Sequence, residues 1–449
     1  MPVSPARAAA FDILLRVEQR DAYASELLHS IQYAKLSSAD HGLTTELVMG
    51  VLRWRSLLDR DISRASSQKL ERLDLEVLVA LRLAAYQIIF LDRIPKRAAV
   101  HESVELVKRA RKRSAVPFAN AILRKLASPA RGSGGVPAIA DATSVAELSE
   151  RSAHPEWLVK RWVEELGYHA AQQICAHDQR APETAIHLGH SGIDPKLDDE
   201  LKKTGVHLEK GQLLVSARRV QSGDVTHTRA FLDGHITIQD EASQLVGLLV
   251  GKGENILDCC AAPGGKTRII AERNPDADIV AIELHPHRSR LLRKLVTAKN
   301  VQVITADMRE LPVSTRFDRV LADVPCSGTG TLARNPEIKW RLKLEDLADL
   351  QTRQLAILRA AMQHVAVGGR LVYSTCSLEP EENAQVVEKA IAADSSFHVR
   401  DCRQELEHLR SSGEFVWNDL DSLTDGPYLR TIPGLHPSDG FFAAILQKS

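Results

Sequence analysis

The chain has 449 residues with 58 Lys/Arg and 58 Asp/Glu, and it is 44% hydrophobic and 26% charged. This length exceeds what one hydrophobic core usually holds, so we expect two or three domains in a soluble globular protein. No apolar run approaches the roughly 18–20 residues that cross a bilayer, and the first 20 residues resemble an amphipathic helix rather than a secretion signal. These features exclude a membrane-spanning protein and predict a cytoplasmic one.

Residues 1–130 have the pattern of a helical domain. Apolar residues recur there at spacings of three and four, and no stretch alternates as a strand would. The segment carries 21 Lys/Arg and 14 Asp/Glu, and KRARKR at 108–113 places five positive charges in six residues. This surplus predicts contact with a polyanion, although a solvated helix face would look the same.

The next two stretches differ from residues 1–130 in their composition and in the spacing of their apolar residues. Residues 131–145 are rich in Gly, Pro, Ser and Ala, which predicts a linker. Residues 146–235 combine a helical stretch at 157–167 with short alternating segments, which predicts a small α+β module.

From residue 236 to 449, predicted strands alternate with predicted helices. This alternation of strands and helices predicts an α/β domain with a doubly wound parallel sheet. In such a sheet, ligands bind beyond the carboxyl ends of the strands. The predicted strands are NILDCCAA (255–262), DIVAIEL (278–284), VQVITAD (301–307), FDRVLADVP (317–325), GRLVYSTCS (369–377) and GFFAAILQ (440–447).

A glycine-containing loop, Asp258 to Thr267, follows the first of these strands. It ends like a phosphate-binding loop, but Cys260 stands where that motif needs its first glycine, and no G-x-G-x-x-G fingerprint is present. Glu283 ends the second strand, where a carboxylate can accept hydrogen bonds from a ribose diol, and Asp307 ends the third, within reach of an adenine amino group. The pattern favours an adenosine cofactor without a phosphate chain, the alternative being solvated acids at strand ends.

Two cysteines follow the fourth and fifth strands of this domain, and both are expected in one crevice. Cys326 lies three residues after Asp323, and Cys376 lies in the segment YSTCS. Methylation at C5 of a pyrimidine needs a thiolate that adds to C6, an acid near N3 and a general base that removes the C5 proton. The target nucleobase must also be unstacked to reach such a site. Either cysteine alone would more often be a core thiol. The pair at strand ends favours catalysis.

The six cysteines are sparse and form no C-x-x-C pair, so neither a disulfide framework nor a structural zinc site is expected. We predict no metal site. The cysteines are Cys175, Cys259, Cys260, Cys326, Cys376 and Cys402.

The motifs resemble those of the RsmB (Fmu/Sun) family of RNA cytosine-5 methyltransferases. The matching segments are DCCAAPGGKT, ADVPCSGTGTLARNPEIKW, YSTCSLEPEEN and GLHPSDGFF, while HPEWLVKRW, DQRAP and IQDEAS resemble the segment before the catalytic domain. AAYQIIFLDRIPKRAAVHESVELVKRA and FANAILRKL resemble the NusB-like helical RNA-binding domain of that family. The resemblance therefore implies a NusB-like all-α domain followed by the α+β module and a Rossmann-like class I methyltransferase domain.

The resemblance also implies roles for individual residues. Cys376 would be the nucleophile and Cys326 would help to release the product, while Lys266 would face the base. S-adenosylmethionine would be the cofactor, and Glu283 stands where the family commonly has Asp. The residues that correspond to cofactor contacts are Cys260, Ala261, Ala262, Pro263, Gly264, Gly265, Lys266, Glu283, Asp307 and Asp323.

The substrate implied by the resemblance is 16S rRNA or an early small-subunit assembly intermediate, methylated at a cytosine by a monomeric enzyme. A tRNA cytosine-5 methyltransferase would share the catalytic motifs. A non-catalytic antitermination factor that only binds RNA would share the NusB-like segment, but it would have no need of two cysteines beside Asp323. Cys259 receives no role.

Overall fold

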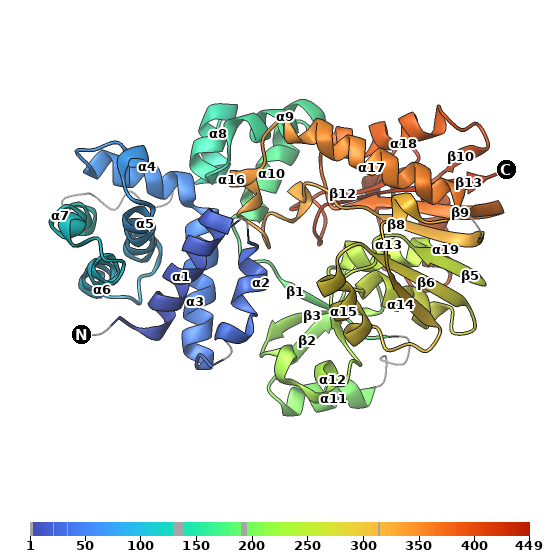
Figure 1. Ribbon diagram of the computed structural model, residues 1–449, viewed down its shortest axis with the longest axis horizontal. Coiled ribbons are helices and arrows are strands. Elements are labelled where there is room, and N and C mark those ends of the chain that lie inside the picture. Colours follow the sequence, from blue (N-terminus) through green and yellow to red (C-terminus); the bar gives the residue numbers. More distant parts are fainter. Residues whose placement is uncertain (1–2, 21, 34, 129–137, 190–194, 313–314) are drawn as a thin grey trace. The chain divides into compact units, whose positions relative to one another are not determined.

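The computed structural model describes residues 3–20, 22–33, 35–128, 138–189, 195–312 and 315–449. The chain divides into two compact units (Figure 1). The first, which we call the helical unit, comprises residues 1–181 together with 332–341. The second comprises residues 182–331 together with 342–449. No helix among the described residues is long and apolar enough to cross a membrane.

The regular elements of the first unit are helices throughout its described residues, as predicted. Over residues 9–126, the three- and four-residue apolar spacing places side chains in a shared core that includes Phe11, Leu47, Leu81 and Leu106. The longer helices are α1 (Pro5–Arg20), α2 (Ala24–Leu28), α3 (Ser38–Arg53), α4 (Arg55–Ala65), α5 (Leu75–Phe90), α6 (Lys96–Arg109), α7 (Val116–Ala127), α8 (Val145–Ser152), α9 (Glu156–Leu166) and α10 (Tyr168–Asp178).

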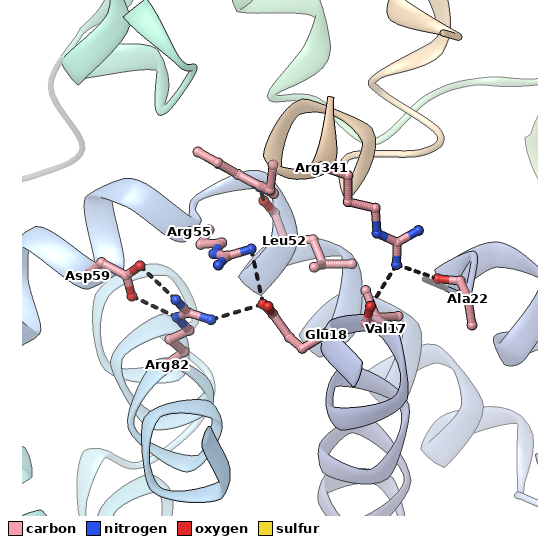
Figure 2. A network of polar contacts seen from close by, with 9 residues as sticks. Val17, Glu18, Ala22, Leu52, Arg55, Asp59, Arg82 and Arg341 are labelled. Carbon is pink, nitrogen blue, oxygen red and sulfur yellow. Dashed lines mark hydrogen bonds and ion pairs between the residues drawn. The ribbon is translucent and has the colours of Figure 1, made fainter. Parts of the chain in front are cut away.

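Helix α5 lies at the centre of this unit and is buried on nearly every side. Its one arginine, Arg82, is 3% exposed and would be costly to bury alone. Its guanidinium donates to both carboxylate oxygens of Asp59, at 2.7 and 2.8 Å, and to Glu18 at 3.0 Å. Arg55 contacts the same Glu18 oxygen at 3.1 Å, so one ion-pair network joins α1, α4 and α5 (Figure 2).

Two stretches belong to the first unit although their sequence suggested otherwise. Helices α8 to α10 lie in the range predicted for the α+β module, yet they pack with the helical unit. Residues 332–341, which we call the inserted segment, include α16 (Ile338–Arg341) and come from within the predicted methyltransferase domain. Of the predicted linker at 131–145, residues 131–137 lie outside the described residues.

The second unit begins with a small antiparallel sheet, which is the β part of the predicted module. Its strand order is β2-β3-β1-β4. Helices α11 and α12 accompany it, and Ile186, Leu201 and Ile236 belong to its core. The elements are β1 (Thr184–His187), α11 (Pro195–Lys203), β2 (His207–Lys210), β3 (Ala217–Ser222), α12 (Arg229–Leu232) and β4 (Thr237–Ile238).

The main sheet of the second unit contains all six predicted strands. Its order is β11-β12-β13-β9-β8-β5-β6-β7, with β10 pairing to β13. The strands β5 to β9 are parallel, whereas β10 to β13 pair antiparallel, so the sheet is mixed. The strands are β5 (Asn255–Asp258), β6 (Asp278–Glu283), β7 (Val301–Thr305), β8 (Phe317–Asp323), β9 (Val365–Thr375), β10 (Phe397–Arg400), β11 (Thr424–Asp425), β12 (Tyr428–Thr431) and β13 (Phe441–Lys448).

Helices bury the main sheet on both sides. Successive residues of β5 enter different cores: Ile256 packs in a core with residues of α13, α14 and α19, and Leu257 packs in one with residues of α17 and α18. This alternation follows from the two-residue period of a strand. The helices are α13 (Glu241–Leu249), α14 (Gly265–Arg273), α15 (Pro286–Leu295), α17 (Asp346–Gln363), α18 (Ala384–Ile391) and α19 (Cys402–Ser411).

Candidate active site

The two predicted cysteines meet at the carboxyl edge of the main sheet. Strands β8 and β9 are parallel neighbours, with Asp323 opposite Ser374, so the loops that follow them leave the sheet side by side. The Cys326 and Cys376 sulfurs lie 3.1 Å apart, and the backbone N–H of Cys376 donates to the Cys326 sulfur at 3.3 Å. Both are free cysteines and neither is fully buried. The two thiols therefore lie side by side at this edge of the sheet.

The contact between the thiols makes them unequal. Hydrogen bonding to Cys376 raises the pKa of the Cys326 thiol well above its usual range, and burial raises it further. The short sulfur–sulfur contact therefore makes ionisation of the Cys326 thiol unfavourable.

A charged pair lies at the same edge of the sheet. The Lys266 ammonium donates to one oxygen of Asp323 at 2.8 Å, and the Ser374 hydroxyl donates to the other at 2.7 Å. Lys266 also lies over the ring of Phe441, 5.0 Å from its centroid, which is a cation–π contact. The predicted residues Lys266 and Asp323, which lie 57 positions apart in the chain, thus form one ion pair at this edge.

Glu382 is a residue to which the sequence analysis assigned no role. It is fully buried, accepts a hydrogen bond from the backbone N–H of Ser327 at 2.8 Å, and also bonds the hydroxyls of Ser327 and Ser377. Gln354 of α17 donates to it at 2.7 Å. Because Ser327 follows Cys326 and Ser377 follows Cys376, this carboxylate holds the two cysteine loops together. Its place in the motif YSTCSLEPEEN was the available signal.

The predicted cofactor loop, residues 260–266, turns between β5 and α14 as expected. Its Ala262–Pro263 peptide is cis, and Gly264 has φ +117°, where a Cβ would approach Val296 and Leu292 to 2.6 and 2.8 Å. Only glycine fits that backbone. The loop lines a cavity of about 440 Å³, whose other walls come from residues 231–239 and 294–297. Lys266 and Asp323 also line this cavity, whereas the two cysteines do not.

Asp258 lies at the start of this loop and lines the same cavity. One carboxylate oxygen accepts from the Thr267 hydroxyl at 2.7 Å, while the other is buried without a hydrogen-bond partner among the described residues. Burial raises the pKa of Asp258 to about 7. A cationic group bound there would supply the missing donor and favour the ionised carboxylate.

The two acids predicted to contact adenosine lie at the expected strand ends but outside that cavity. Glu283 is 4% exposed, and one of its oxygens accepts from the backbone N–H of His285 at 2.8 Å. Arg309 holds Asp307, and its hydrogen bonds lower the pKa of that carboxyl. Cys259 is buried, and burial raises the pKa of its thiol.

The second unit has a mixed sheet, with a glycine loop after its first parallel strand and reactive groups at its carboxyl edge. These features define a methyltransferase domain, which is joined here to a helical domain. The family model of the 16S rRNA methyltransferases RsmB/F matches residues 246–447, and the NusB family model matches residues 4–128. The chain belongs to the RsmB/F methyltransferase family and carries a NusB-like N-terminal domain.

Individual relatives agree with this assignment over the full length. The chain is 34% identical to a probable ribosomal RNA small subunit methyltransferase B of Bacillus subtilis, with 100% of both chains covered. It is 32% identical to the ribosomal RNA small subunit methyltransferase B of Vibrio cholerae, covering 98% of this chain and 97% of that one. A solved methyltransferase homologue from Pyrococcus horikoshii shares the fold over 69% of this chain and 100% of its own, with TM-score 0.56 and 23% identity.

Proposed function

We propose that this protein transfers a methyl group from S-adenosylmethionine to C5 of a cytosine in 16S rRNA, through a covalent bond between Cys376 and C6. The observation that supports this most directly is the 3.1 Å contact between the two sulfurs at the edge that also holds the Lys266–Asp323 pair. Family membership supports the choice of RNA, and C5 of a pyrimidine is the carbon whose methylation needs such a nucleophile.

The residues around the glycine loop fit the cofactor. The buried oxygen of Asp258 that lacks a donor suits the ammonium of its methionine portion, and the Gly264 backbone allows close approach. Glu283 would accept from the ribose hydroxyls and Asp307 from the adenine amino group, while residues 260–265 would pack against the nucleoside. S-adenosylmethionine supplies the electrophilic methyl group.

The protein groups divide the remaining work. Cys376, as thiolate, adds to C6 and makes C5 nucleophilic. Asp323, held by Lys266 and Ser374, hydrogen-bonds the N3 edge of the ring and stabilises the charge that develops there. After methylation, a base at this edge of the sheet removes the C5 proton, the C5–C6 double bond re-forms and the C6–S bond breaks, so that Cys376 leaves as its thiolate. We assign to Cys326, whose sulfur lies 3.1 Å from that of Cys376, assistance in the release of the Cys376 sulfur.

The direct test is to incubate purified protein with S-adenosylmethionine and 16S rRNA and to map 5-methylcytosine by bisulfite sequencing. We expect one protected cytosine with the wild type and none with Cys376→Ala. Methylation of tRNA but not of 16S rRNA would make tRNA the substrate in place of 16S rRNA. Methyl transfer to a purine would overturn the proposed mechanism.

The basic run of the helical unit is a second part of the proposal. Lys108, Arg109 and Lys112 form ion pairs with acidic side chains of the same unit. Arg111 and Arg113 are exposed, and no ion pair is observed for either within the described residues. We propose that these two arginines contact RNA phosphates.

A further inference from the structure

The inserted segment, residues 332–341, continues directly from the loop that carries Cys326. Gly330 belongs to the active-site edge, since its N–H donates to the carbonyl of Cys376 at 2.9 Å and its carbonyl accepts from Gly440 at 2.8 Å. Only Thr331 separates Gly330 from Leu332, the first residue that packs in the helical unit. In the sequence, the inserted segment therefore begins only two residues after Gly330.

Within the helical unit, the inserted segment satisfies the ends of three helices. Arg341 donates to the carbonyls of Val17, in the last turn of α1, and of Ala22, both at 2.7 Å (Figure 2). The Trp340 indole donates to the carbonyl of Leu52 at 2.6 Å, near the end of α3. These last-turn carbonyls have no partner inside their own helices, and cations are favourable beside them.

Two further residues of the segment complete this pattern. The Lys339 ammonium donates to the carbonyl of Arg53, the last residue of α3, at 2.9 Å. Glu337 accepts from the N–H of Ala24, the first residue of α2, at 2.8 Å. Thus hydrogen-bond donors of the segment lie at the carboxyl ends of helices and one of its carboxyl groups lies at an amino end. Lys339 and Glu337 are each only 1% exposed, so the segment is built into the unit.

The helical unit also holds the segment from its own side. Arg53 is 6% exposed and donates to the carbonyl of Ala333 at 3.0 Å. Arg55 lies over the Trp340 ring, 5.7 Å from its centroid, and Glu18 binds Arg55 within the network that includes Arg82 (Figure 2). Movement of the segment would therefore break contacts to α1, α3 and α4 together.

We propose that the inserted segment is the joint through which the helical unit positions its bound RNA for the cysteine pair, and that Trp340 and Arg341 are the positioning residues. This inference rests on the proposed function. Its physical basis is continuity: Gly330, two residues before the inserted segment, is hydrogen-bonded to Cys376, and the segment itself contacts three helix termini. If those contacts loosen, the helical unit still binds RNA, but the target cytosine is no longer held in place.

The test uses the full chain with the double variant Trp340→Phe/Arg341→Met, which removes the three hydrogen bonds to Val17, Ala22 and Leu52 but keeps most of the apolar bulk. We measure RNA affinity, cofactor affinity and the single-turnover rate of 16S rRNA methylation. We expect both affinities to stay near the wild-type values while the rate falls about tenfold or more, since misplacement by about 1 Å can cost about a hundredfold.

Arg341→Lys is the conservative variant, and it should recover part of the rate because it keeps the charge but not the planar group. The matched control is Arg353→Met in α17, which removes only an exposed ion pair with Asp349 and should leave the rate unchanged. If the double variant does not fold, Trp340→Phe alone decides the matter.

An unchanged rate in a folded variant would overturn the inference, and so would a loss of RNA affinity that accounts for the whole loss of rate. A wild type that methylates no RNA would instead overturn the proposed function.

Discussion

The Cys326 loop (326–331) and the inserted segment (332–341) are consecutive parts of one sequence motif, but their residues make opposite kinds of contact. The loop leaves reactive groups partly open at the edge of the main sheet, tied by Glu382 and by backbone hydrogen bonds. The segment buries Glu337 and Lys339 in the helical unit, where these residues and Arg341 contact helix ends. One contiguous sequence motif therefore carries both reactive groups of one unit and structural contacts within the other.

The largest difference should come from the two cysteines of the catalytic loops. Cys376→Ala should abolish methylation and form no covalent adduct, because the nucleophile is missing. Cys326→Ala should still form the adduct and then fail to resolve it, giving a protein–RNA band that survives denaturing electrophoresis. RNA carrying 5-fluorocytosine should trap the wild type similarly. The reverse pattern in the two variants would exchange their roles.

A glycine pair tests how rigidly the loop is held. A Cβ at Gly330 would lie 2.2 Å from the carbonyl oxygen of Gly440, so Gly330→Ala should destabilise the protein by about 1–3 kcal/mol and impair catalysis. Gly42 in α3 is the matched control, because nothing lies within 4 Å of its Cβ position. Gly42→Ala should stabilise by about 0.5–1 kcal/mol. Thermal unfolding distinguishes them, and equal effects would contradict a rigid loop.

Glu283 lies in neither region, so its effect should be confined to the cofactor. Glu283→Ala should weaken S-adenosylmethionine binding by about 1–3 kcal/mol, the cost of lost charged hydrogen bonds, with RNA affinity unchanged. Calorimetry measures both. An unaltered cofactor affinity would remove Glu283 from the site.

The inserted segment should contribute to the pH dependence of the free energy of unfolding. Burial lowers the pKa of Lys339 from its usual 10.5 to about 7. Between these values the unfolded chain binds the proton and the folded chain does not, so this group makes stability rise with pH through that window. Lys339→Met should remove that part of the dependence. Denaturant unfolding of both proteins from pH 7 to pH 10 measures it, and parallel curves would show that Lys339 does not titrate as described.

The smallest effect is expected on the exposed side of the helical unit. Replacing Arg111 and Arg113 by Ser should weaken RNA binding and reduce the slope of log affinity against log salt by roughly one per lost phosphate contact. Lys160→Ser is a control on an exposed face of α9 in the same unit. Cofactor binding should not change in either protein. An unaltered salt slope would place RNA elsewhere on the chain.

These comparisons also separate what local pattern predicted from what it missed. The strands β5 to β9 were predictable because apolar runs of strand length alternated with helical periods. The meeting of Cys326 with Cys376 followed, since parallel strands bring their carboxyl ends to one edge. The role of Glu382 was not predictable, because a carboxylate six residues after Cys376 gains its meaning only when Ser327, 55 residues away, donates to it.

By itself, the sequence determined the helical N-terminal region, the alternating strands and helices of the C-terminal region, and which strand ends carry acids and thiols. These properties depend on periodicity over a few residues. Only the tertiary structure decided that α8 to α10 and residues 332–341 belong to the helical unit and that β10 to β13 pair antiparallel. The inserted segment shows the reason. Lys339 and Arg341 look like ordinary surface charges in sequence. Lys339 is buried and Arg341 partly buried only because helix ends distant in the chain present carbonyls to them.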